Sequence, residues 1–168
     1  MRRPTGTKPT PVITSTDVAR WTPLVRIRGR SMQPTLAAGQ VLLTRPARGR
    51  LAIGDVVVAT TPAGARIVKR IAAAPGDVVT VEAGRLAVNG QPRDGQPRLA
   101  GAHVQTWHVP PGHYFLVGDN LQASDDSRVW PQPFVAASRI SGVVFKRWPW
   151  RPLAQPQFLA HKSCRNSA

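Results

Sequence analysis

Short apolar runs, separated by glycine, proline and polar residues, recur along most of the chain. Apolar and β-branched residues fill eight of these runs, and each run is too short for an ordinary helix. The predicted strands are 24–27, 41–44, 55–59, 66–72, 78–81, 86–88, 114–117 and 140–145. Asn89-Gly90 follows the sixth strand directly and is a strong hairpin signal. Because 17 prolines and 14 glycines interrupt any long helix, we expect a mainly β fold.

Polar segments mark the ends of the predicted domain. Residues 1–20 and 152–168 are polar and proline-bearing without apolar periodicity, so we expect two flexible tails. Residues 21–151 are long enough for a single sizeable core. Within them, 82–108 is polar and rich in glycine and proline.

Lys69 has an unusual position in the predicted strand 66–72. Alternation along a strand puts Ile67, Lys69 and Ile71 on one face. A lysine between two isoleucines is expected on a buried face, where desolvation lowers its pKa. Such an amine can accept a proton near neutral pH. The alternative is a solvated lysine at a strand edge, which is the commoner situation for this residue.

Ser31 lies in the predicted turn Gly29-Arg30-Ser31-Met32-Gln33-Pro34. A serine hydroxyl needs a neighbouring base to act as a nucleophile, and Ser-Lys pairs are one recurring solution. Gly29 permits an unusual φ and Pro34 stiffens the turn. The same residue types fill ordinary turns, which is the alternative interpretation. The nucleophile-elbow motif Gly-x-Ser-x-Gly is absent because Gln33 occupies its last position.

A third segment, 118–128, concentrates acidic side chains in a basic chain. It holds three of the eight acidic residues, together with Asn120, two serines and Arg128. Such a loop can be held by side-chain to backbone hydrogen bonds and by a buried Asp-Arg pair. The alternatives are a solvated turn or a weak cation site, although the spacing lacks the ligand pattern of an EF-hand.

Four segments occur in the order of the conserved boxes of one enzyme family. The chain resembles the type I signal peptidases, including their mitochondrial inner-membrane relatives, from about residue 25 to 147. The matching segments are Ser31-Met32-Gln33-Pro34-Thr35-Leu36, Gly54-Asp55-Val56-Val57-Val58, Lys69-Arg70-Ile71 with Pro75-Gly76-Asp77, and Gly118-Asp119-Asn120 through Ser124, Asp126, Ser127 and Arg128.

The resemblance implies a serine endopeptidase with a Ser-Lys dyad and an acyl-enzyme intermediate. Ser31 would be the nucleophile and Lys69 the general base, and the Ser31 backbone N–H would contribute to the oxyanion hole. Ser124 would orient the Lys69 amine, while Asp126 and Arg128 would brace the site. No metal or organic cofactor is expected.

The resemblance also assigns lesser roles. Asp119 and Asn120 would support the site, and Met32 and Pro34 would contact substrate. Some members carry a serine where this chain has Gly29, so the oxyanion hole here would depend on backbone donors around that residue. Substrates would be precursor proteins with small residues, as in Ala-x-Ala, before the cleavage site.

The resembled fold is an antiparallel β-sheet catalytic core with a small, variable β insert. The insert corresponds to residues 82–108 and the core to the rest of 21–151. Members are usually membrane-anchored and act on the extracytoplasmic face. This chain has no apolar run near the roughly 20 residues that span a bilayer, and no secretory signal peptide. The alternatives are peripheral docking, a soluble cytoplasmic enzyme, or an anchor on an upstream segment that this sequence does not include.

Net charge adds two hypotheses about partners. A charge of +15 and the segment Phe145-Lys146-Arg147-Trp148-Pro149-Trp150-Arg151 favour contact with an anionic membrane surface. The same charge fits a nucleic-acid-binding module, but no zinc-finger spacing, basic zipper, helix-turn-helix or RNA-recognition signature is present. Nucleic acid is therefore not an expected partner. A soluble maturation peptidase that trims one specific protein is the other alternative.

The remaining candidates for chemistry are weak. Cys164 is the only cysteine, so no internal disulfide can form. His103, His108 and His113 recur every five residues, a spacing that gathers side chains on neither a strand nor a helix face. We therefore expect no metal site.

Overall fold

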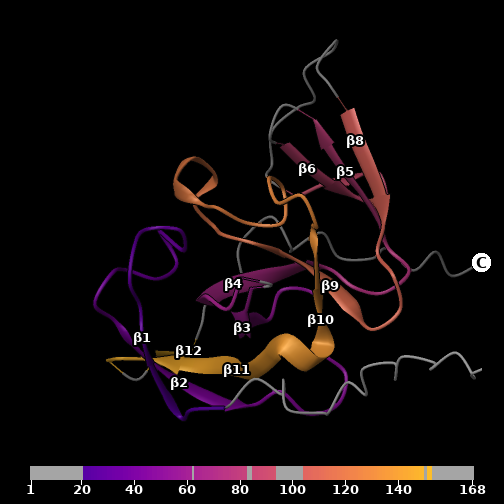
Figure 1. The fold of residues 1–168 in the computed structure, drawn as a ribbon. Coiled ribbons are helices and arrows are strands. Elements are labelled where there is room, and N and C mark those ends of the chain that lie inside the picture. Colours follow the sequence, from indigo (N-terminus) through magenta and orange to yellow (C-terminus); the bar gives the residue numbers. More distant parts are fainter. Residues whose placement is uncertain (1–20, 62, 83–84, 94–103, 150, 153–168) are drawn as a thin grey trace, which may run out of the picture.

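Two antiparallel β-sheets make up the described part of the chain, as Figure 1 shows. The computed structural model describes residues 21–61, 63–82, 85–93, 104–149 and 151–152. The tails expected at 1–20 and 152–168, apart from Pro152, lie outside these residues, as do His103 and Cys164.

The larger sheet has the strand order β1-β2-β11-β3-β4-β9-β10, with β12 paired to β11. Its strands are β1 (Leu24–Arg26), β2 (Val41–Pro46), β3 (Val56–Thr60), β4 (Arg66–Ala73), β9 (His113–Val117), β10 (Phe134–Ala136), β11 (Ile140–Arg147) and β12 (Arg151–Pro152). Two short 3-10 helices, η1 (Leu121–Ala123) and η2 (Ala137–Arg139), interrupt its connections.

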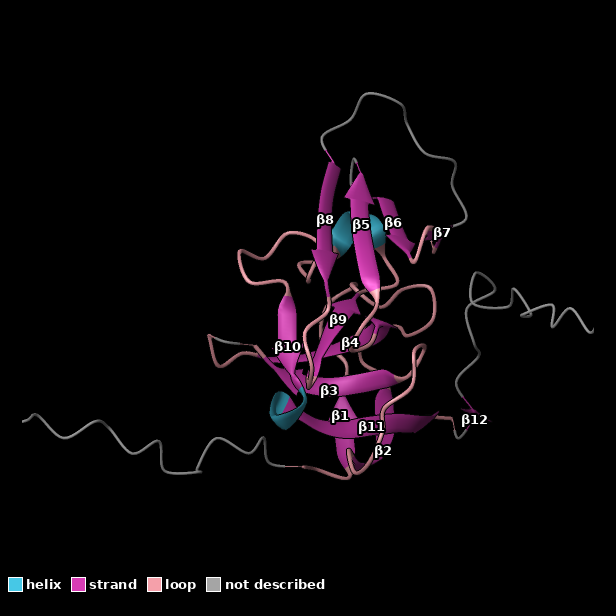
Figure 2. Ribbon diagram, turned by 90° about the vertical axis from the view of Figure 1, so that its right-hand side faces the viewer, coloured by secondary structure: helices cyan, strands magenta, loops and turns pink. Residues whose placement is uncertain are grey.

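The smaller sheet projects from one end of the larger one, which is clearest in Figure 2. Its order is β7-β6-β5-β8, formed by β5 (Val78–Glu82), β6 (Arg85–Val88), β7 (Gln91–Pro92) and β8 (Val104–His108). The sheet begins at Val78, before the 82–108 interval, because β5 pairs with both β6 and β8.

The mainly β prediction is confirmed, and all eight expected strands are present within a few residues of their predicted ends. The expected hairpin turn is also present, since Asn89 and Gly90 have φ values of 51° and 75°. The strands that the sequence did not predict are β7, β8, β10 and β12. Each is very short or, like β8, mostly exposed and polar, so no apolar run marks it.

Apolar side chains bury both faces of the central strands. On β3, Val57 belongs to one core cluster with Ile71, whereas Val56 and Val58 belong to another cluster with Met32 and Leu36. Strands covered on both faces are continuous apolar runs, which explains the sequence Val-Val-Val-Ala. A third cluster, around Phe115, joins the two sheets.

Strand pairing leaves two edges open. β4 pairs with β3 along residues 66–70, but its pairing with β9 begins only at Arg70. In the described part of the chain, β1 pairs with β2 alone. The segment 66–69 and strand β1 therefore each present an edge with no strand partner among the described residues.

Candidate active site

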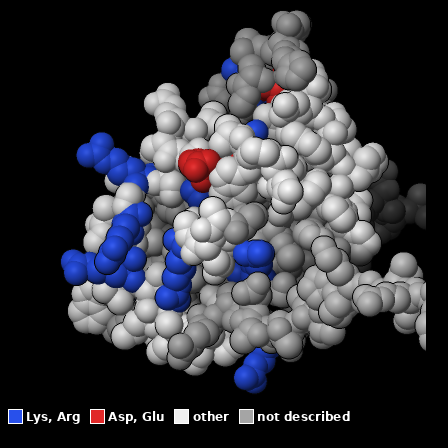
Figure 3. All heavy atoms as spheres, in the orientation of Figure 1, with Lys and Arg blue, Asp and Glu red and all other residues white. Residues whose placement is uncertain are grey.

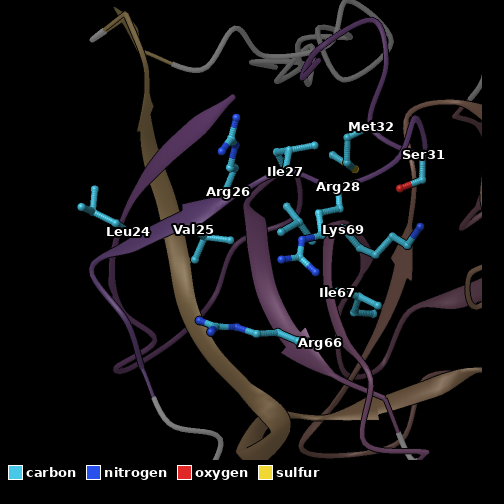
Figure 4. A pocket seen from close by; sticks show the side chains of 11 residues that line it. Leu24, Val25, Arg26, Ile27, Arg28, Ser31, Met32, Arg66, Ile67 and Lys69 are labelled. Atoms are coloured by element: carbon cyan, nitrogen blue, oxygen red, sulfur yellow. The ribbon is translucent and has the colours of Figure 1, made fainter. Parts of the chain in front are cut away.

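A cleft of about 450 Å³ lies between these two strand edges. Its walls are formed by consecutive residues, 24–28 on one side and 66–69 on the other. Neighbouring residues of a strand point to opposite faces of the sheet, so a cleft on one face would contact only every second residue. This cleft contacts every residue of both segments and therefore runs along the strand edges. Figure 4 shows Ser31 and the amine end of Lys69 together at one end of the cleft.

The Ser31 turn is anchored by the core beneath it. Met32 is 1% exposed and Leu36 is fully buried, and the Leu36 N–H donates to the Met32 carbonyl at 2.8 Å. Gly29 has a φ of 82°, in the left-handed region that glycine adopts without a steric penalty. Ser31, next to this anchored pair, is half-buried and reaches the cleft.

The loop after β9 holds the Ser31 turn from the other side. The Asn120 N–H donates to the Ser31 carbonyl at 2.9 Å, and the Asn120 side-chain amide donates to the Arg30 carbonyl at 3.2 Å. Gly118 packs closely against the Ser31 carbonyl. A Cβ at this position would overlap both the Ser31 carbonyl oxygen and the Ser124 side chain. Any side chain at this position would separate the two segments.

Lys69 is buried, with 3% of its surface exposed, and its Nζ lies 2.8 Å from Ser124 Oγ. The register pairs Lys69 with Val57, so its stem lies on the same apolar face as Ile71. Burial lowers the pKa of the Lys69 amine. The charge of Asp126 opposes this effect and that of Arg128 adds to it, and the pKa stays below its ordinary value.

Asp126 is the centre of a buried polar cluster. Its carboxylate accepts hydrogen bonds from the Gly118 N–H at 2.8 Å, from the Ser124 hydroxyl, and from Arg128 through Nε at 2.8 Å and Nη2 at 2.6 Å. Burial by itself raises the pKa of Asp126, but the hydrogen bonds and charge of Arg128, together with the hydrogen bonds from Gly118 and Ser124, hold the pKa below its usual range. Asp126 is therefore ionised at neutral pH.

The ionised carboxylate fixes the direction of the neighbouring hydrogen bonds. It has no proton to give, so the single hydrogen of the Ser124 hydroxyl points to Asp126. The Ser124 oxygen must then accept from Lys69 Nζ. A neutral Lys69 amine held in this way keeps its lone pair free for another donor.

A second buried ion pair lies beside the first. Arg70, 2% exposed, donates to Asp119 through Nε at 2.8 Å and Nη2 at 2.7 Å, and to the Gly54 carbonyl at 2.7 Å. Arg70 and Gly118 lie in the segments that match the family, but only their partner Asp119 was predicted to support the site. One feature of the sequence could have indicated a buried ion pair at Arg70. It is a cation within an apolar strand, and the chain has only eight acidic residues that could pair with it.

The structure brings most of the candidate residues together, but one lies apart. Met32 lines the cleft, whereas Pro34 is exposed and does not line it. His108 ends β8 of the smaller sheet, whereas His113 begins β9 of the larger one. Among the described residues, no three histidine, cysteine or acidic side chains gather as a metal site would require.

Comparison with known proteins agrees with this geometry. The family model described as signal peptidase, peptidase S26, matches residues 12–150. Signal peptidase I of Bacillus caldolyticus is 32% identical over 76% of this chain and 80% of its own length. The chain belongs to the signal peptidase family.

Other members of the signal peptidase family are similar over comparable lengths. Signal peptidase IB of Staphylococcus aureus strain COL is 31% identical over 74% of this chain and 76% of its own length. The crystal structure of a signal peptidase I from Enterococcus faecalis V583 matches with a TM-score of 0.45 and 26% identity, covering 56% of this chain and 97% of that one. As a signal peptidase, the chain is a serine endopeptidase that removes signal peptides from precursor proteins.

Proposed function

We propose that the enzyme cleaves its substrates through a Ser31-Lys69 dyad and an acyl-enzyme intermediate. Ser31 Oγ attacks the scissile carbonyl carbon while its proton passes to Lys69 Nζ. Lys69 then gives this proton to the leaving amine as the C–N bond breaks. A water molecule next loses a proton to Lys69 and attacks the Ser31 ester, and Ser31 recovers its proton as the acid product leaves.

The observation that carries this proposal is the buried Lys69 amine with its lowered pKa, at the same end of the cleft as Ser31. The Ser124 oxygen accepts a hydrogen bond from one N–H of this amine, because the Ser124 hydroxyl donates its hydrogen to Asp126. The lone pair is then free to accept the proton of Ser31. A protonated lysine could not act as the base, so the lowered pKa matters as much as the position.

The proposed oxyanion hole uses the Ser31 N–H. None of the hydrogen bonds between described residues uses this group as a donor. The carbonyl of the same residue is held by Asn120, which fixes the orientation of the turn. Gly29 adopts the left-handed φ that this turn requires. A preorganised donor of this kind contributes about 2.7 to 4 kcal/mol of transition-state stabilisation.

We further propose that the substrate binds as an extended strand between β1 and the segment 66–69. Open strand edges offer unpaired backbone groups that an added peptide strand can satisfy. Val25, Ile27 and Met32 give the cleft an apolar floor, and Met32 directly follows Ser31. Alternate side chains of an extended peptide would face this floor, which suits the small residues of an Ala-x-Ala site.

A peptide-cleavage assay tests the dyad. A detergent-solubilised precursor with an Ala-x-Ala site is incubated with the wild type, Ser31→Ala and Lys69→Ala, and the products are located by mass spectrometry. We expect cleavage after Ala-x-Ala by the wild type alone. Equal cleavage by all three proteins would reject the assignment of Ser31 and Lys69.

The face formed by β1, β2 and β11 is proposed to dock on an anionic membrane. Leu24 and Trp148 are each 55% exposed there and Phe145 is 40% exposed. Figure 3 shows Lys and Arg side chains gathered on the side of the molecule where β1 lies. In the described residues no helix is long and apolar enough to cross a membrane. Co-sedimentation with phosphatidylglycerol vesicles, but not with phosphatidylcholine vesicles, is the expected result.

By its resemblance to membrane-anchored signal peptidases, the docked enzyme is proposed to work on the extracytoplasmic face of a membrane. The cleft opens beside Leu24, so a docked enzyme would receive its substrate at the membrane surface. Fractionation of cells that produce the protein checks this location. Recovery wholly in the cytoplasmic fraction would favour the alternative, a soluble peptidase that trims one specific protein.

A further inference from the structure

The cleft that holds Ser31 and Lys69 is also lined by three arginines. Arg26, Arg28 and Arg66 contribute to its walls, and all three are exposed. None of the described residues that line the cleft is acidic. The walls of the cleft are therefore positively charged over the length where the substrate would lie.

These arginines are only partly satisfied within the protein. Arg26 donates to the Gly39 carbonyl at 3.3 Å, and Arg66 donates to the Thr22 hydroxyl. Both acceptors are uncharged. Within the described part of the chain, no hydrogen bond or ion pair involves the Arg28 guanidinium, which Figure 4 shows reaching into the middle of the cleft.

We infer that the cleft selects substrates with an acidic side chain close before the cleavage site. This inference rests on the proposed binding of an extended peptide between β1 and the segment 66–69. It names a substrate preference in addition to the small residues of Ala-x-Ala. The specificity-determining residues are Arg28 and Arg66, from opposite walls of the cleft.

The strand geometry assigns positions to this preference. In an extended peptide the first and third residues before the scissile bond face the apolar floor, so the second and fourth face outward. Arg66 lies three residues along β4 from Lys69, about 10 Å at the usual rise per residue. An outward side chain two to four residues before the bond is thus within reach of Arg28 and Arg66. A carboxylate there would meet cations in a cleft that concentrates their field.

Three peptides test the preference, identical except that x in Ala-x-Ala is Glu, Gln or Lys. We expect kcat/KM to fall in that order, with the Glu peptide about fivefold better than the Gln peptide at low salt. High salt should reduce the ratio because exposed charges are screened. In the variants Arg28→Gln and Arg66→Gln the Glu/Gln ratio should fall toward one.

Arg48→Gln is the matched control. It removes the same charge from an exposed arginine that does not line the cleft, so the Glu/Gln ratio should persist. Equal kcat/KM for all three peptides, or an unchanged ratio in the Arg28 and Arg66 variants, would overturn the inference. So would variants that keep the ratio but lose binding to phosphatidylglycerol vesicles, because the arginines would then serve a membrane.

A binding measurement separates failure of this inference from failure of the proposed function. Fluorescence anisotropy of labelled Glu and Lys peptides is measured with Ser31→Ala, which requires no catalysis. Tighter binding of the Glu peptide supports the acidic preference even if the wild type cleaves none of the peptides. Cleavage of the Gln peptide combined with equal binding of the Glu and Lys peptides would leave the dyad in place and reject the preference.

Discussion

Two buried cations occupy consecutive positions on β4, and their surroundings differ in one respect. Lys69 contacts the hydroxyl of Ser124, which separates it from the carboxylate of Asp126. Arg70 contacts the carboxylate of Asp119 directly, through two hydrogen bonds. Arg70 is therefore a neutralised structural charge. No carboxylate of the described residues contacts Lys69 directly, and burial lowers the pKa of its amine.

This difference would let one strand carry both a structural ion pair and the proposed base. Alternation sends the two side chains to opposite faces of β4, so each meets a different part of the loop after β9. The bidentate Arg70-Asp119 pair links β4 to that loop, and Arg70 also reaches Gly54. The rigid loop can then present Ser124 to Lys69.

The largest expected effect is that of Lys69→Met. We expect kcat to fall by at least about 10⁴-fold, as for the loss of a catalytic base that acts together with its nucleophile. We also expect the free energy of unfolding to rise by about 1 kcal/mol, because an apolar side chain replaces an unneutralised buried amine. Peptide hydrolysis and urea denaturation measure the two effects.

The sign of this stability change depends on pH. The pKa of Lys69 is lower in the folded chain, so the unfolded chain binds more protons between the two pKa values, and the buried amine destabilises the fold below the ordinary lysine pKa. The gain from Lys69→Met should thus be present at neutral pH and shrink as the pH rises toward that value. Ser31→Ala is the control, inactive but without the gain. A loss of stability in Lys69→Met would contradict the proposed contrast with Arg70.

Arg70→Met should have the opposite effect on stability. It leaves the Asp119 carboxylate, whose side chain is 4% exposed, without its cation, and such a loss typically costs about 3 to 5 kcal/mol. The double variant Arg70→Met, Asp119→Leu should recover most of this loss because both charges are then gone. If the double variant were no more stable than the single one, Arg70 would act through contacts other than its ion pair.

The sequence predicted the strand that carries Lys69 and Arg70 better than it predicted the contacts of these two side chains. Alternation around Lys69 indicated a buried lysine, because two isoleucines flank it at a spacing of two. The pairing of Arg70 with Asp119 joins residues 49 positions apart, and no local pattern specifies such a contact. The same limit applies to the cleft. The cleft forms because the larger sheet curves and brings its edge strand β1 close to β4, and the order of the strands does not specify this curvature. The position of Pro34 outside the cleft could not be predicted for the same reason.

Gly118→Ala tests whether the loop must approach the Ser31 turn closely. The added Cβ would overlap the Ser31 carbonyl and Ser124, so the loop must move away and carry Ser124 with it. A displacement of about 1 Å can cost about 10²-fold in rate, and we expect kcat to fall by that order. Gly64→Ala is the control for a change without a contact: its φ of 85° makes alanine strained there, but the added Cβ would meet nothing within 4 Å. Equal activity in the two variants would show that the contact at Gly118 is not needed.

The smallest expected effect is on the acid limb of the pH profile of kcat/KM. The proposed base is the neutral Lys69 amine, so kcat/KM should fall as the pH decreases through its pKa. The charge of Asp126 raises this pKa, and Asp126→Asn should move the acid limb to lower pH. Asp125 also raises the Lys69 pKa, but less, so Asp125→Asn should give a smaller shift in the same direction. An acid limb that stays in place in both variants would mean that a group other than Lys69 controls it, and Lys69 would then be no more the base than Arg70.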